Sequence, residues 1–216
     1  MVHGTRKGCS LLGVLGVLVL VTGCATNKGG QAKEARRAVT SMHKTRQELA
    51  KAEVQVDDMV GAMNELASAS PDHLASAYKM FNRQLARTVS QADAARSRAN
   101  EMRERWRDYI NSWEREIEQL STPGLQANAA ERRQAVEKNY DRLREAARAM
   151  DQAYPPFLTH LKDIQKTLSL DLTSAGIQAA QPAFENARES AADLKQKIAD
   201  FMVQIDQVQA VSPPRT

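Results

Sequence analysis

The fold is decided by residues 78–120, which read YKMFNRQLARTVSQADAARSRANEMRERWRDYINSWEREIEQL. Apolar or small side chains return here every seven positions, at Tyr78, Leu85, Ala92, Ala99, Trp106, Trp113 and Leu120. A second series begins three positions later and comprises Phe81, Ala95, Met102 and Tyr109, with Thr88 and Glu116 as polar members. Because a seven-residue repeat keeps side chains on one seam of a helix, the stretch predicts a long helix of a bundle or coiled coil. Trp106 and Trp113 lie on this seam and are predicted to be core anchors.

The residues before this stretch indicate where the helix begins. Ser70 offers a capping hydroxyl, Pro71 suits the first turn of a helix, and Asp72 is an acid near the positive end of the dipole. About 50 residues from this point would form a helix about 75 Å long, because each residue adds 1.5 Å. The sequence therefore predicts a rod rather than a globule.

One further helix is predicted before this stretch, over residues 31–67, and another near the C-terminus, over residues 177–208. The apolar stripe of the first is the weaker, because Arg46 and Glu53 fall on it. The stripe of the last keeps a three- and four-residue spacing throughout, with Ile177, Ala180, Phe184, Ala187, Ala191, Leu194, Ile198, Phe201, Ile205 and Val208.

Another helix is predicted from about Leu125 to Leu168, with Pro155 and Pro156 inside it. Each proline removes a backbone donor and clashes with the preceding turn. Because the apolar spacing keeps its phase across both prolines, we expect a kinked but continuous helix. A break at the prolines is the alternative.

The connection between the two middle helices is short, with Ser-Thr-Pro-Gly at residues 121–124. A loop of this length places neighbouring helices antiparallel. The predicted fold is all-α, an elongated antiparallel bundle or coiled coil of about four helices over residues 31–210. Residues 211–216 are predicted to be a disordered tail.

Residues 1–23 have the pattern of a secretory signal peptide. Arg6 and Lys7 form its positively charged region, and Leu11 to Val21 form its apolar stretch. That stretch is about eleven residues long, and a helix that crosses a bilayer needs about 20. The segment therefore predicts export rather than a transmembrane helix.

The end of this segment, Leu20-Val21-Thr22-Gly23-Cys24, resembles the lipobox of bacterial lipoproteins. The resemblance implies cleavage before Cys24 and acylation of this cysteine with diacylglycerol and palmitate-like chains, which hold a protein on a membrane. Residues 24–30 would then be the lipidated cysteine and a flexible tether. By resemblance to enterobacterial sorting, Ala25 favours the outer membrane, facing the periplasm. An ordinary signal peptide with an incidental cysteine is the alternative.

Several residues in the helical region occur in the order found in one protein family. They are Trp113-Glu114-Arg115-Glu116-Ile117, Tyr140-Asp141-Arg142-Leu143, Met150, Pro156, Leu158, Leu161 and Leu168. In this order they resemble the bacterial proteins of domain-of-unknown-function family 2959, over about residues 78–208. The chain departs from the family pattern at residues 121–126, where an arginine-bearing loop is expected. The resemblance implies a helical, exported protein and brings no activity with it.

No catalytic, cofactor or metal site is predicted from the residue pattern. His43, His73 and His160 fall on three different segments, and no serine or cysteine stands in a recognisable nucleophile motif. Glu114 and Glu118 could form a carboxylate pair, but one helical turn between them is more typical of a solvated face. With Cys9 in the segment expected to be removed, Cys24 would be the single cysteine of the mature chain.

The charge balance does not indicate nucleic-acid binding, which requires basic residues concentrated on one face. Residues 24–216 carry 28 basic and 26 acidic side chains, because Arg6 and Lys7 account for two of the 30 basic residues of the chain. One basic run lies on the long helix and comprises Arg96, Arg98, Arg103, Arg105, Arg107 and Arg115. These arginines could contact lipid phosphates. The acids interleaved with them, Glu101, Glu104 and Asp108, favour a solvated face with little net field.

The function expected from these features is that of a non-enzymatic, lipid-anchored helical scaffold or partner-binding protein in the bacterial cell envelope. Its expected partners are the membrane, through the lipid anchor, and a protein of unknown identity, and a homo-oligomer is left open. No nucleic acid and no cofactor are expected. The alternatives are a membrane-active or lipid-binding helical protein and, third, an enzyme.

Overall fold

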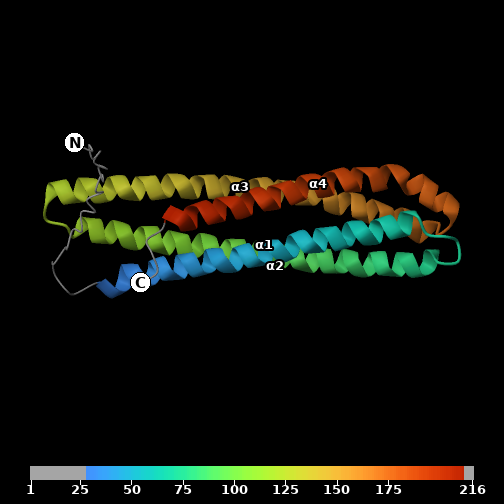
Figure 1. Ribbon diagram of the computed structural model, residues 1–216, viewed down its shortest axis with the longest axis horizontal. Helices are drawn as coiled ribbons and strands as arrows, with labels where there is room; N and C mark the ends of the chain where they lie inside the picture. The colour runs from blue at the N-terminus through green and yellow to red at the C-terminus, as the bar shows by residue number, and fades with distance from the viewer. Residues whose placement is uncertain (1–27, 212–216) are drawn as a thin grey trace, which may run out of the picture.

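The computed structural model describes residues 28–211, which form four α-helices joined by short turns. The helices are α1 (Lys28–Ala67), α2 (Leu74–Glu118), α3 (Pro123–Leu170) and α4 (Ser174–Val211). Figure 1 shows them side by side in one elongated body, each antiparallel to the helix before it. The predicted all-α antiparallel bundle is confirmed, and residues 28–211 contain no strand. At 1.5 Å per residue, the 48 residues of α3 span about 72 Å.

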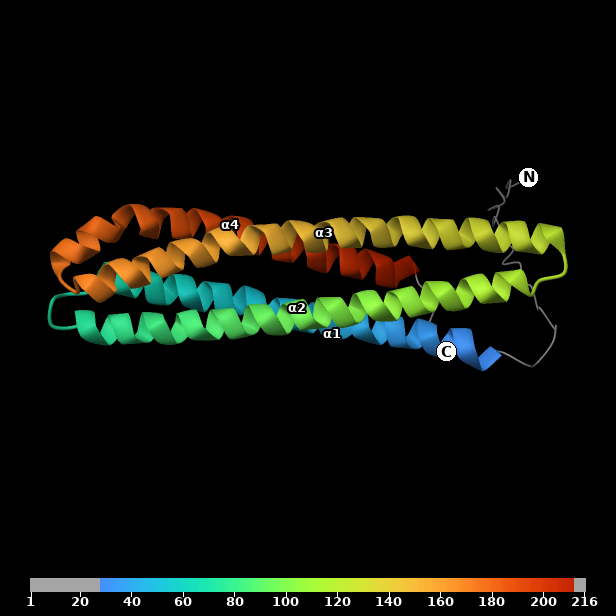
Figure 2. The ribbon, with the colours of Figure 1, turned by 180° about the vertical axis from the view of Figure 1, so that it is seen from behind.

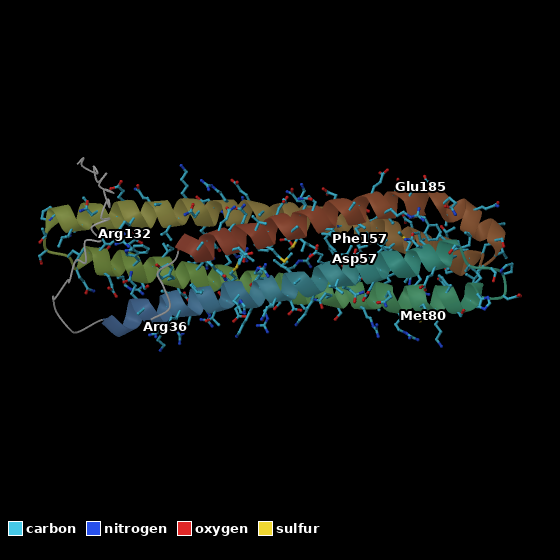
Figure 3. The ribbon with its side chains drawn as sticks, viewed as in Figure 1. Arg36, Asp57, Met80, Arg132, Phe157 and Glu185 are labelled. Atoms are coloured by element: carbon cyan, nitrogen blue, oxygen red, sulfur yellow. The ribbon has the colours of Figure 1, made fainter. Side chains whose placement is uncertain are left out.

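A continuous hydrophobic core lies along the axis of the bundle. Its largest fully buried side chains are those of Phe81 from α2, Phe157 from α3, and Phe184 and Phe201 from α4. The fully buried apolar side chains of α1 are Met42, Leu49, Met59, Met63 and Leu66. Figure 3 shows Phe157 inside the bundle, with Arg36 on an outer face. Because burial of one such side chain contributes about 1.5–3 kcal/mol, these apolar seams stabilise the rod.

The bundle consists of two closely packed hairpins, α1 with α2 and α3 with α4. Contacts of α1 with α4 and of α2 with α3 close the ring of helices. Aromatic side chains bridge α2 and α3: the Trp106 ring stacks on Tyr140 with 4.5 Å between the centroids. The Tyr78 hydroxyl donates a 2.9 Å hydrogen bond to the backbone oxygen of Gln165. Large side chains therefore join the two hairpins.

The start of α2 differs from the prediction. The backbone N–H of His73 donates a 2.9 Å hydrogen bond to the carbonyl oxygen of Ser70, which closes a separate turn around Pro71. The helix begins only after this turn, at Leu74. The prediction that the Ser70 hydroxyl caps the helix is therefore wrong, and this hydroxyl instead lies 3.0 Å from Nδ1 of His73.

The other three helices begin earlier than predicted, and α4 starts at Ser174, three residues before Ile177. α1 starts at Lys28, three residues before Gln31, so it includes the end of the segment interpreted as a tether. α3 starts at Pro123, where a fixed φ and a missing N–H cost little because the first N–H groups of a helix have no partner within it. Pro123 and Gly124 thus belong to the helix rather than to the loop.

The prolines inside the helices do not break them. α3 continues through Pro155 and Pro156, as expected, and both rings are exposed while the adjacent Phe157 is fully buried. Figure 2 shows the axis of α3 changing direction in the second half of the helix. α4 also continues through a proline, Pro182, whose ring is exposed. The apolar spacing of this helix is regular on both sides of Pro182. Prolines on the outer face cost backbone hydrogen bonds but leave the core seam intact.

The turn before α4 requires a glycine. The backbone N–H of Gly176 donates a 3.3 Å hydrogen bond to Oγ1 of Thr173, which caps the helix. A β-carbon on Gly176 would overlap the carbonyl oxygen of Asp171. The close approach of these two backbone segments sets the sharp return from α3 to α4.

The unequal lengths of the helices leave one end of the bundle without α4. Figures 1 and 2 show that α4 ends before the turn between α2 and α3, whereas α1 begins close to that turn. Near the end of α4, Asp206 lies 2.7 Å from Arg46 of α1. The Thr45 hydroxyl donates a 3.1 Å hydrogen bond to the carbonyl oxygen of Arg98 in α2. The first turns of α1 therefore pack on α2 beyond the end of α4.

Candidate functional site

The predicted lipidation site lies outside the described residues, which begin at Lys28. That site is Cys24, and the signal segment 1–23 also lies outside the described residues. Of the predicted tail 211–216, Val211 is the last residue of α4 and residues 212–216 are not described. Lipidation and export therefore stay predictions.

The histidines occupy three separate places in the described part of the chain. His43 is exposed on α1, His73 lies in the turn before α2, and His160 is half-buried on α3. No group of three or more histidine, cysteine, aspartate or glutamate side chains among residues 28–211 is arranged to hold a metal ion. The structure does not bring the histidines together.

Two histidines of the described residues lie near a serine, His73 beside Ser70 in the turn before α2 and His160 beside Ser190 between α3 and α4. Only the contact of His160 joins two helices. Nδ1 of His160 lies 3.2 Å from Oγ of Ser190. The serine hydroxyl donates to its own helix, with Oγ 2.7 Å from the carbonyl oxygen of Asn186. No described acid pairs with the imidazole, so the third group that orients a catalytic base is missing from residues 28–211. The contact is therefore best interpreted as a link between α3 and α4.

The carboxylates singled out from the sequence lie on the surface. Glu114 and Glu118 are both exposed on α2. An oxygen of Glu114 lies 3.5 Å from Arg133 of α3, which gives this acid a partner across the two helices. This arrangement favours the interpretation of a solvated face that joins α2 to α3.

Three of the six arginines in the run of α2, Arg96, Arg98 and Arg105, form ion pairs. Arg98 lies 2.8 Å from Glu101, and Arg96 lies 3.5 Å from Asp93. Arg96 also lies 3.7 Å from Asp151 of α3. These local ion pairs reduce the net field of the run, in line with the solvated face expected from its interleaved acids.

The aromatic side chains form a cluster at the contact of α2 with α3. Trp106 is buried, as predicted, but Trp113 is only half-buried and lies 5.6 Å from Tyr109 between ring centroids. Burial raises the pKa of Tyr140 to about 12, although the positive charge of Arg103 opposes this shift. Burial also raises the pKa of Tyr109. Both phenols are therefore neutral near pH 7 and act as packing groups.

A small apolar cavity lies in the middle of the bundle, where α2 carries alanines. All four helices line it, with Ala52, Gln55, Val56, Thr88, Gln91, Ala92, Ala95, Arg96, Met150, Asp151, Tyr154, Leu194 and Ile198. Its volume is about 40 Å³. Such a space holds about two or three water molecules, whereas ligand pockets usually measure about 300–1,000 Å³. The cavity is a packing gap rather than a ligand site.

A larger, basic cleft lies between the first turns of α1 and the facing part of α2. It has a volume of about 430 Å³ and is lined by Lys33, Arg36, Arg37, Thr40, Ser41, Lys44, Glu101 and Arg105. These residues, called the basic cleft below, supply five cationic side chains and one carboxylate. Figure 3 shows Arg36 on an outer face of α1. The basic cleft is wide enough for a small ligand, and its lining is polar and mostly cationic.

The cations of the basic cleft fall into two groups. Arg37 lies 2.8 Å from Glu34, and Arg105 lies 3.8 Å from Asp108. The other three, Lys33, Arg36 and Lys44, form no ion pair with any residue among 28–211. The cleft therefore keeps a net positive charge after its internal ion pairs are counted.

The basic cleft was not predicted, although part of its signal is visible in the sequence. Lys33, Arg37, Thr40 and Lys44 follow one another at three- and four-residue spacing, which places them on one face of a helix. The sequence alone therefore shows that α1 carries a basic face. It does not show that Arg105 lies opposite this face, because that depends on how α1 and α2 are aligned.

Comparison with known proteins adds one identification. No protein of curated function and no solved structure matches the chain. The model of a family described as "Protein of unknown function (DUF2959)" matches residues 25–211. This match spans every described helix, and the chain belongs to the DUF2959 family.

Proposed function

We propose that the chain is a lipid-anchored, non-catalytic scaffold or partner-binding protein of the bacterial cell envelope, facing the periplasm from the outer membrane. The observation that carries this proposal is the continuous core shared by four long helices. Close packing of this kind resists bending, so the bundle holds its two ends at a fixed separation. A stiff rod of about 70 Å suits a scaffold.

The sequence pattern at residues 1–24 supports the anchor. The four steps from Cys24 to Lys28 span at most about 14 Å, because an extended chain covers about 3.3–3.6 Å per residue. An acylated Cys24 would therefore hold the beginning of α1 close to the headgroups of a bilayer. The rod would start at the membrane surface rather than at the end of a long linker.

The anchor is tested by labelling cells with palmitate and separating membranes from soluble protein. The wild-type chain should carry label and sediment with membranes, whereas Cys24→Ala should lose the label and remain unprocessed. A matched control, Cys9→Ala, should keep both properties, because Cys9 lies in the segment expected to be removed. Label on Cys24→Ala would contradict the anchor.

The scaffold is tested by placing a photo-crosslinking residue at exposed apolar positions of the rod. Val54 of α1 and Val203 of α4 have side chains 60% and 50% exposed. Positions on a partner-binding face should give one discrete adduct in cells, identified by mass spectrometry, that disappears in the Cys24→Ala background. If no position along the four helices gives an adduct, the scaffold proposal is wrong.

A second candidate function is that of a membrane-active or lipid-binding protein. It is favoured by two exposed leucines at the turn between α3 and α4, Leu170 (82% exposed) and Leu172 (36% exposed). Within residues 28–211, no helix has both the length and the apolar character needed to cross a bilayer. Dye leakage from vesicles that is abolished by Leu170→Ser with Leu172→Ser would favour this candidate over the scaffold.

A further inference from the structure

We propose that the basic cleft is a binding site for a phosphate group, and that a phospholipid headgroup supplies this phosphate. Such binding would hold the first turns of α1, together with the facing turns of α2, against the membrane surface. The inference goes beyond the scaffold proposal. It depends on the proposed anchor only for the source of the phosphate.

The cationic groups line one cleft from two helices. Lys33, Arg37 and Lys44 lie on one face of α1, and Arg105 faces them from α2. The Thr40 hydroxyl adds a neutral donor at the centre of this face. Donors therefore come from two helices and surround a volume of about 430 Å³.

The charge of the cleft is not satisfied within the described residues. Lys33, Arg36 and Lys44 have no acid within ion-pair distance among residues 28–211. Arg36 donates through Nε to the carbonyl oxygen of Ala32, at 3.3 Å, and so keeps its terminal guanidinium N–H groups for another partner. The single carboxylate of the cleft, Glu101, is held by Arg98 at 2.8 Å.

The chemistry of these donors favours phosphate. Guanidinium groups bind phosphate through two parallel N–H donors, and lysine ammonium groups add point charges. A cleft with five cations and one carboxylate suits a group that carries one or two negative charges and several acceptor oxygens. A neutral or apolar ligand would leave these charges unpaired.

The place of the cleft in the chain favours a lipid as the source. Lys33 lies five residues after the start of α1, which adds about 7.5 Å along the helix. With an acylated Cys24, the cleft would lie within about 25 Å of the anchor. A cleft within this reach of the anchor can contact the headgroup layer, where basic residues are attracted to anionic lipids.

The test uses the fragment Ala25–Thr216, which keeps all four helices and the entire buried core between Ala38 and Val208. Its helical circular dichroism and cooperative melting are measured first. Binding is then measured by sedimentation with vesicles of equal parts phosphatidylglycerol and phosphatidylcholine, and with vesicles of phosphatidylcholine alone. Because the fragment lacks Cys24, the result is independent of whether the anchor exists.

The decisive variant combines Lys33→Gln, Arg36→Gln and Lys44→Gln, which removes the three unpaired cations and keeps the internal ion pairs. The matched control combines Lys79→Gln, Arg83→Gln and Arg87→Gln. These three cations are also exposed and unpaired among residues 28–211, and they lie on α2 toward the other end of the bundle. Both variants change the net charge by the same amount, so they separate a defined site from general attraction.

The affinity of the cleft variant for the anionic vesicles should fall on the order of 100-fold, which corresponds to about 1 kcal/mol for each of the three cations. The affinity of the control should fall less than about threefold. Equal losses in both variants, or no loss in either, would overturn the proposal. A second arm measures thermal stabilisation of the fragment by glycerol 3-phosphate. Stabilisation that the cleft variant abolishes, without vesicle binding, would identify a free phosphate compound as the source. Absence of both effects would refute phosphate recognition.

Discussion

Replacing Trp106 by alanine removes a buried ring from the contact that joins the two hairpins. The side chain is 4% exposed, and its ring stacks on Tyr140 with centroids 4.5 Å apart and 7° between the planes. It also meets the ring of Tyr109 nearly edge-on, at 5.6 Å. Because this ring bridges α2 and α3, the space it leaves can close only if a whole helix shifts.

The expected loss of stability follows from these contacts. Truncation of a buried tryptophan to alanine costs about 3–5 kcal/mol, because apolar burial is lost and a cavity remains. Each aromatic pair contributes about 0.5–1.5 kcal/mol beyond area burial, so two pairs place Trp106→Ala near the upper end, at about 4–5 kcal/mol. For a domain of this size, that loss lowers Tm by about 8–20 °C.

The assay is thermal unfolding followed by the helical circular dichroism signal, with urea unfolding to obtain the free energy. Trp113→Ala is the matched control, because Trp113 is half-buried and makes a single tilted contact with Tyr109. Its loss should be about half as large, about 2 kcal/mol. If Trp106→Ala changes Tm by less than about 2 °C, or if both variants lose the same stability, the assignment of Trp106 as the main anchor is refuted.

Three further predictions concern single residues. Gly176→Ala should cost about 1–3 kcal/mol in urea unfolding, because its β-carbon meets backbone, whereas Gly124→Ala, with open space around it, should be neutral or stabilising. The raised pKa of Tyr140, about 12, means that folding favours the neutral phenol, so its contribution is complete below pH 10 and is lost as the pH rises toward 12. Stability should therefore fall less steeply over that interval in Tyr140→Phe than in the wild type, and parallel curves would contradict the burial of this phenol. Arg46→Gln should change the free energy of unfolding by less than about 1 kcal/mol, although Arg46 lies 2.7 Å from Asp206, because both side chains are exposed; a larger loss would be contrary to this account.

Apolar spacing was sufficient to predict the helices because the core depends on it directly. Phe81, Ala95, Met102 and Tyr109 are all buried, as the seven-residue repeat requires. Continuity through Pro155 and Pro156 also followed from the phase of the core residues around them. The ends of the helices could not be predicted from the apolar spacing. They depend on single hydrogen bonds, such as that from the N–H of His73 to the carbonyl oxygen of Ser70, which periodicity does not specify.

The candidate site was harder to predict because it depends on register. A stripe on α1 shows which side chains share a face, but not which residues of α2 lie opposite. The contact between Thr45 and Arg98 sets this alignment, and it places Arg105 beside Arg37 and Lys33 in the basic cleft. Nothing in the repeat of either helix alone fixes that pairing. The end of α4, which leaves this part of α1 uncovered, is likewise a property of the assembled bundle.

The proposed attachment of the rod to a bilayer through Cys24 can be measured by mass spectrometry of the protein purified from bacterial membranes. A lipid-anchored chain should give an N-terminal peptide that begins at Cys24 and carries the added mass of a diacylglyceryl group, with or without a third acyl chain. A mature chain that begins at another residue, or an unmodified Cys24 thiol, would contradict this attachment.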